Sequence, residues 1–163
     1  MFGRVEDTLR TFSFLKGVKA VNDQGQLLGK VEDVVLNAKG TVLGWVICKK
    51  RLLPHRTYVP CQGAHVSLDH SLVCCKGEVT KVPHLPSGCF YIGKGPRNLW
   101  KQALCSSDGC TEAVIEDVYF SSDWSKIIAI EVTKGLFPDW NDGRPLIYSH
   151  EPVTIGTQRL FVR

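Results

Sequence analysis

The sequence predicts an all-β protein made of two small antiparallel β-barrels in tandem. Three observations indicate this fold: short apolar runs, turn signals too closely spaced for long helices, and a repeated pattern. The repeat is visible because GKVEDVVL at 29–36 returns as AVIEDVYF at 113–120, 84 residues later. Short apolar runs with close turns are typical of small antiparallel barrels and sandwiches. With 44% hydrophobic and 22% charged residues, the chain of 163 residues is expected to fold.

The first unit is divided into strands by its turns. An alternating segment at 15–22 predicts a strand that ends at Asp23-Gln24-Gly25, where Gly25 is expected to take a positive φ. A second strand is predicted at 29–37. The nearly continuous apolar segment 41–50 indicates a central buried strand. Shorter strands with close turns complete the unit.

The internal repeat predicts the domain boundaries. An ungapped comparison of 15–56 with 99–140 finds eight identities in 42 positions, and the matches fall at turns and on apolar faces. We therefore expect domains at 1–82 and 98–163, joined by a Pro- and Gly-rich linker at 83–97. The segment 96–105 also has helical spacing, but its match to the first strand favours a strand.

The opening of the first unit resembles a PRC-barrel domain. In that family an apolar strand, a D-x-G turn, a Gly-Lys-Val-x-Asp-Val strand and a Gly-containing apolar strand follow in order. Here these are Val18 to Val21, Asp23-Gln24-Gly25, Gly29 to Val34 and Val42 to Ile47, and the likeness extends over about 15–75. The second copy keeps less of the pattern, since Ala113 and Val114 replace the strand's Gly-Lys. The resemblance implies a small β-barrel in each half, without catalytic residues or cofactors.

The resemblance also implies several roles. The family is named for the cytoplasmic domain of the photosynthetic reaction-centre H subunit, and it includes the C-terminal domain of a ribosome maturation factor. Many bacterial and archaeal members have no assigned role. This sequence shows neither the membrane helix of the H subunit nor the N-terminal domain of the ribosomal factor, so neither role is expected to transfer directly.

The repeated acidic pair is expected to be structural. Glu32 and Asp33 are neighbours on a predicted strand and therefore point to opposite faces, which excludes a paired-carboxylate site. We expect one carboxylate to be solvated and the other to bind a nearby turn or backbone amide. The repeat is then one structural unit present twice.

Seven cysteines are many for this length. Because no export signal is visible, the thiols are expected to be reduced. Cys48 is predicted to lie in the core, and the adjacent Cys74 and Cys75 to face opposite sides of a strand. No C-x2-C pair is present, so no metal is expected, and a cysteine-dependent redox or metal protein is a secondary alternative.

Two equivalent loops carry the candidate interaction residues. KKRLLPHR at 49–56 and TKGLFPDW at 133–140 each present two large apolar residues before a proline. Cationic loops attract phosphates or acidic proteins. Alternatively, the apolar residues cap their own barrels beneath solvated charges. The candidate residues are Lys49, Lys50, Arg51, Leu52, Leu53, His55, Arg56, Leu136, Phe137 and Trp140.

The function that these features predict is that of a non-enzymatic, cytoplasmic adaptor or assembly protein. Its partner is expected to be another protein or a macromolecular complex, with a ribosome- or RNA-associated factor, or an H-subunit-like protein of a photosynthetic complex, as alternatives. A homo-oligomer is compatible with the sequence. No membrane span is expected, because no run reaches the ~18–20 apolar residues that a bilayer requires.

Overall fold

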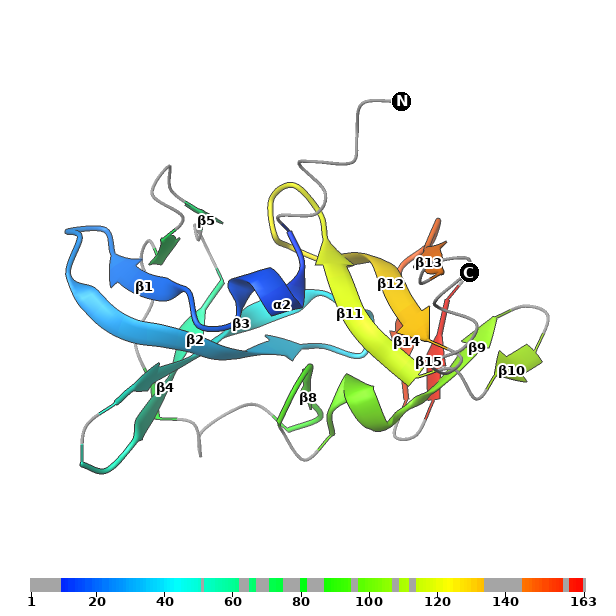
Figure 1. Cartoon of the computed structure of the whole chain (residues 1–163), viewed down its shortest axis with the longest axis horizontal. Coiled ribbons are helices and arrows are strands. Elements are labelled where there is room, and N and C mark those ends of the chain that lie inside the picture. The colour runs from blue at the N-terminus through cyan, green and yellow to red at the C-terminus, as the bar shows by residue number, and fades with distance from the viewer. Residues whose placement is uncertain are drawn as a thin grey trace.

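Short strands make up most of the regular structure (Figure 1). The computed structural model describes residues 10–50, 52–61, 65–66, 71–74, 80–81, 87–94, 97–106, 109–111, 114–133, 145–156 and 159–162. Within these residues, the helical elements are a single turn, α2 (Phe12–Leu15), and a 3-10 turn, η2 (Leu99–Lys101). The all-β prediction is therefore confirmed. Among the described residues, no helix is both long and apolar enough to cross a bilayer.

The strands of the first half form one sheet. They are β1 (Lys19–Asn22), β2 (Leu27–Leu36), β3 (Val42–Lys49), β4 (His55–Pro60), β5 (His65–Val66), β6 (Leu72–Cys74) and β7 (Thr80–Lys81). Their order across the sheet is β5-β6-β1-β2-β3-β4-β7. Neighbours are antiparallel except β1 and β6, which are parallel.

The second half repeats this order. Its strands are β9 (Ala103–Ser106), β10 (Gly109–Thr111), β11 (Val114–Phe120), β12 (Ile127–Thr133), β13 (Leu146–Tyr148), β14 (Thr154–Ile155) and β15 (Arg159–Phe161). They form two sheets, β14-β15-β9-β10 and β11-β12-β13, and β15 is parallel to β9 as β6 is to β1. Together β10 and β11 occupy the place of the long strand β2. The tandem repeat itself stays a prediction.

Each half pairs with the segment that leads into the other half. β8 (Phe90–Tyr91) precedes the second half and pairs with β2, with Tyr91 opposite Val35. Thr11 precedes the first half and bridges to Tyr119 in β11, the residue 84 positions after Val35. Within the predicted linker, Phe90 and Ile92 are buried, so residues 90–92 contribute to the sheet and the core. The division into two domains stays a prediction.

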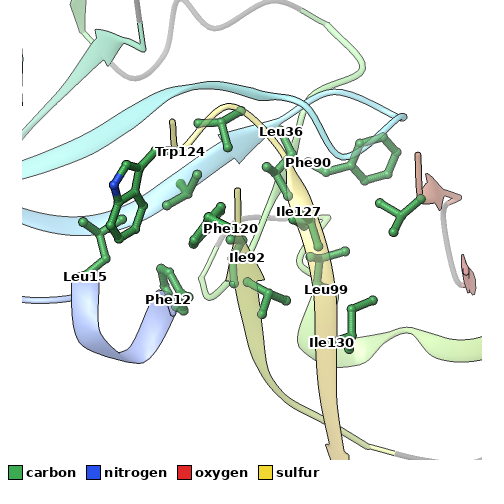
Figure 2. Packing of buried hydrophobic residues seen from close by; sticks show 14 of the residues in the cluster. Phe12, Leu15, Leu36, Phe90, Ile92, Leu99, Phe120, Trp124, Ile127 and Ile130 are labelled. Carbon is green, nitrogen blue, oxygen red and sulfur yellow. The ribbon is translucent and has the colours of Figure 1, made fainter. Parts of the chain in front are cut away.

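The buried apolar side chains of the two halves form one cluster (Figure 2). Within this cluster, Trp124 lies 5.5 Å from Phe120 and 6.4 Å from Trp45, measured between ring centroids. The β2–β3 and β11–β12 turns also meet directly, because the amide of Val42 donates to the carbonyl of Ser125 at 2.8 Å.

The predicted strand boundaries need two corrections. Residue 15 ends α2 rather than beginning a strand, because the Thr11 hydroxyl caps this turn by accepting a hydrogen bond from the amide of Phe14. In segment 96–105, the helical turn η2 precedes the strand β9, so the segment contains both of the alternatives, helix and strand. The turn at Gly25 is confirmed, with a φ of 75°.

Candidate functional site

The β3–β4 tip, defined as Lys49 to Arg56, exposes two adjacent leucines. The hairpin is paired as far as Lys49 and His55, and residues between them form its end. Leu52 is 105% exposed and Leu53 is 83% exposed, so the alternative in which these two residues cap their own barrel is wrong. In Figure 1 the tip projects at the lower left, away from the second half.

An ion cluster holds the base of the tip. The guanidinium of Arg56 donates from both Nε and Nη2 to the two carboxylate oxygens of Glu32, with Nη2 at 3.1 Å from Oε1. The ammonium of Lys94 lies 3.7 Å from the same carboxylate. The hydrogen bond from Arg56 is the main cause that lowers the pKa of Glu32. Arg56 therefore has a structural partner, and of the cations that the structure describes in the tip, the exposed Lys49 and Lys50 are available to a ligand.

The second acid of the pair is buried and fully engaged. Asp33 is 3% exposed and accepts hydrogen bonds from the amide of its neighbour Val34 and from three consecutive amides, Ile92, Gly93 and Lys94, at 2.7–3.1 Å. The prediction that one carboxylate binds backbone amides is confirmed. The other carboxylate, Glu32, is held by two cations rather than by solvent alone.

A row of cations continues from the tip across the sheet. Lys19 in β1 lies opposite Lys30 in β2, Lys30 lies opposite Cys48 in β3, and Cys48 lies opposite Arg56 in β4. Directly opposed residues of paired strands project from the same face. The exposed Lys19 and Lys30 therefore project from the same face of the sheet as Arg56, at the base of the tip. Sequence reasoning missed these two residues because it did not establish the strand register.

The cysteines give little support to redox or metal chemistry. Cys105 is disulfide-bonded, which corrects the expectation of a reduced thiol at this position, whereas Cys48, Cys61 and Cys89 are free; the β9–β10 register places Cys110 opposite Cys105. Burial raises the pKa of Cys61 to about 11 and also raises that of Cys89, so these thiols are protonated near neutral pH and are poor nucleophiles. Cys48 is half-buried rather than in the core. Among the described residues, no cluster of three or more His, Cys, Asp or Glu could hold a metal.

Part of the predicted site lies outside the described residues. These positions are Arg51 in the first loop and Leu136, Phe137 and Trp140 in the second. The interaction loop expected at 133–140 therefore stays a prediction, as does the arrangement of Cys75. The structure does bring together Lys49, Lys50, Leu52, Leu53, His55 and Arg56 on one hairpin.

Comparisons with known proteins agree with the fold. The family model of the PRC-barrel domain matches residues 7–73. A Bacillus subtilis (strain 168) protein, described as uncharacterized protein YrrD, is 30% identical to this chain over 138 residues. The match covers 83% of this chain and 76% of that protein, so it extends well beyond the first half. This chain is a member of the PRC-barrel domain family.

Proposed function

We propose that the protein is a non-enzymatic adaptor that docks onto a larger assembly through the β3–β4 tip. The exposure of Leu52 and Leu53 is the observation that carries this proposal. Single exposed apolar residues are normal on a protein surface, but adjacent ones that project together form an apolar patch, and such patches mark interaction sites.

The conformation of the tip is restrained before it binds a partner. The Arg56–Glu32 pair and Lys94 hold its base, and the ladder of backbone pairs between β3 and β4 continues to Lys49 and His55. Pro54 restricts the backbone directly before β4. A restrained hairpin loses less conformational entropy when it binds, so more of the contact energy contributes to affinity.

The acidic groups support an adaptor rather than an enzyme. Asp33 accepts four backbone hydrogen bonds, which commit its oxygens to holding the chain. Glu32 is held by Arg56 and Lys94, and the lowered pKa keeps it ionised at neutral pH. Both carboxylates thus have a structural use, and the lowered pKa of Glu32 is the opposite of what a general acid needs.

A ribosomal or RNA partner is the alternative that Lys49 and Lys50 favour, because basic residues bind phosphates without regard to sequence. The tip sequence KKRLLPHR has no Phe, Tyr or Trp. Proteins that bind single-stranded nucleic acid usually stack bases on such rings. The leucines, which the RNA alternative leaves unexplained, therefore weigh toward an apolar contact.

Sedimentation of the full chain in a lysate of its native host tests the proposal. We expect the parent protein to sediment with a large assembly and the variant L52S/L53S to remain near the top of the gradient. The matched control V114S/Y148S removes two exposed apolar side chains from the second half and should sediment like the parent. Identical profiles for the parent and L52S/L53S would contradict the adaptor role of the tip.

A further inference from the structure

We propose that the surface bound by the β3–β4 tip is an anionic lipid bilayer. Leu52 and Leu53 insert into the boundary between headgroups and acyl chains, while Lys49 and Lys50 contact lipid phosphates. This inference rests on the proposed function, since it names the chemical class of the partner for the same tip.

The order of residues along the tip matches the layers of a bilayer, in which the apolar acyl chains lie beneath charged headgroups. The two leucines occupy the apex, and cations stand on both sides of them in KKRLLPHR. Leucine is among the residues that most favour transfer into the hydrocarbon of a bilayer. Lysine side chains can extend along apolar groups and leave their ammonium in the headgroup region. A projecting hairpin reaches such a layer without a complementary pocket.

The charges around the tip are complementary to acidic phospholipids. The segment 49–56 contains no Asp or Glu, and the exposed Lys19 and Lys30 add positive charge on the face of the sheet from which Arg56 projects. Glu32, at the base, is already paired with Arg56 and Lys94. Asp23, in the β1–β2 turn, is outnumbered by the lysines. Positive charge beside an anionic surface adds to the affinity of each inserted apolar group.

A lipid surface explains the apex better than a protein pocket. Hot spots of protein interfaces are enriched in Trp, Tyr and Arg, whereas Leu is under-represented there. The apex of this tip is two leucines, which a bilayer accepts in any orientation. Peripheral membrane binding is stable when apolar insertion and a basic patch act together, and the tip combines both.

Vesicle sedimentation with the purified full chain tests the inference. The probes are vesicles of phosphatidylcholine alone and vesicles of phosphatidylcholine mixed with phosphatidylglycerol. We expect binding to the mixed vesicles only, weakened by salt. L52S/L53S should bind at least about tenfold more weakly, because each leucine loses its apolar contact. K49S/K50S should bind roughly 25-fold more weakly, at about fivefold for each cation.

Two matched controls separate the tip from the rest of the surface. V114S/Y148S removes exposed apolar groups from the second half. K39S/K126S removes one exposed lysine from the β2–β3 turn and one from the β11–β12 turn. Both variants should bind like the parent. All the substituted side chains are exposed, and an unchanged melting temperature verifies that each variant is folded.

The outcomes separate this inference from the proposed function. Failure of the parent to bind mixed vesicles, or equal binding by L52S/L53S, overturns the lipid assignment. If sedimentation from lysate still depends on Leu52 and Leu53, the adaptor role stands and its partner is a protein or an RNA. If neither assay depends on the two leucines, both proposals are wrong.

Discussion

Asp33 and Asp117 hold equivalent places in the two halves, and each binds the segment that leads into the other half. Asp33 uses both oxygens to accept three long-range amides, at residues 92–94. Asp117 accepts one long-range amide, that of Ser13, at 3.1 Å through Oδ1. Each also accepts the amide of the next residue. The two carboxylates therefore have the same structural role. Asp33 holds its segment with more hydrogen bonds than Asp117 does.

The hairpin turns show a second difference. Gly40 in the β2–β3 turn and Trp124 in the β11–β12 turn are 84 residues apart, and both have left-handed backbones, with φ of 71° and 61°. Glycine adopts this conformation without strain, but tryptophan does not. The ring of Trp124 packs against Phe120 and Trp45, and this contact offsets the strain. Equivalent backbones can therefore carry unlike residues when the surrounding core differs.

The largest expected effect comes from removing the two carboxylates. Asp33→Ala leaves three long-range amides without their acceptor, and two of these are only partly buried. It should therefore lower the free energy of unfolding by roughly 3–5 kcal/mol, the lower part of the range that about 1–3 kcal/mol for each unpaired group gives. Asp117→Ala should cost roughly 1–2 kcal/mol, since one long-range amide is involved. Urea unfolding of the full chain measures both. Asp33→Asn keeps one acceptor oxygen, so its stability should lie between those of the parent and Asp33→Ala. Equal losses for the two Ala variants would contradict the difference between Asp33 and Asp117.

The turn at Gly40 gives the next effect. A Cβ at this position would lie 2.3 Å from Cγ2 of Val153, and φ is positive, so Gly40→Ala should cost roughly 2–3 kcal/mol from overlap and strain together. In a Val153→Ala background the overlap is removed, and the added cost of Gly40→Ala should fall to about 1 kcal/mol. Thermal unfolding measures this double-mutant cycle. A cost that is the same in both backgrounds would show that strain alone decides the residue.

The ion pair at the tip gives a smaller effect, and it distinguishes the halves at another matched position. The place of Arg56 is taken in the second copy by Trp140, which has no charge. Arg56→Ser removes the ion pair with Glu32. It should therefore lower the free energy of unfolding by up to about 1 kcal/mol, and by less at high salt. Lys49→Ser, the control, should stay within about 0.5 kcal/mol. A double-mutant cycle with Glu32→Gln measures the coupling, and zero coupling would remove the pair from the base of the tip.

The smallest effect concerns pH. Hydrogen bonds from Ser121 and Ser125 lower the pKa of Asp123 from 3.8 to about 2. The stabilising contribution of this carboxylate is therefore present above pH 3.8 and is lost as the pH falls through about 2. The amide of Ser125, which donates to Asp123, should shift in NMR spectra with that midpoint. In the matched turn the acceptor is the uncharged Asn37, so the amide of Thr41 should not follow this titration.

Local signals in the sequence predicted much of the fold. The strands expected at 29–37 and 41–50 are β2 and β3 within two residues, and the turn at Gly25 has its positive φ. These features depend on neighbouring residues. The pairing of β8 with β2 was not predicted, because the Pro- and Gly-rich composition of 83–97 indicated a linker and the partner strand lies more than fifty residues earlier.

The sequence predicted which residues belong to the candidate site, but not which of them are exposed and which are paired. The sequence identified the hairpin 49–56 by its cations, leucines and proline. It left open whether Leu52 and Leu53 face the core, because that depends on how far the hairpin extends beyond the sheet. It also placed Arg56 among the free cations, since the alignment of β2, β3 and β4 that brings Glu32 to it follows from register rather than from composition.

The reciprocal pairing of the halves sets an order of events while the chain is being synthesised. Asp33 emerges from the ribosome 60 residues ahead of Gly93, and Ser13 emerges 104 residues ahead of Asp117. The carboxylate of Asp33 is therefore synthesised before the amides of residues 92–94 that it binds. A nascent chain that ends before Phe90 leaves the β2 edge at Val35 without β8, and an unpaired edge of this kind can recruit a strand from another molecule. In the complete chain, pairing of β8 with β2 covers this part of the edge.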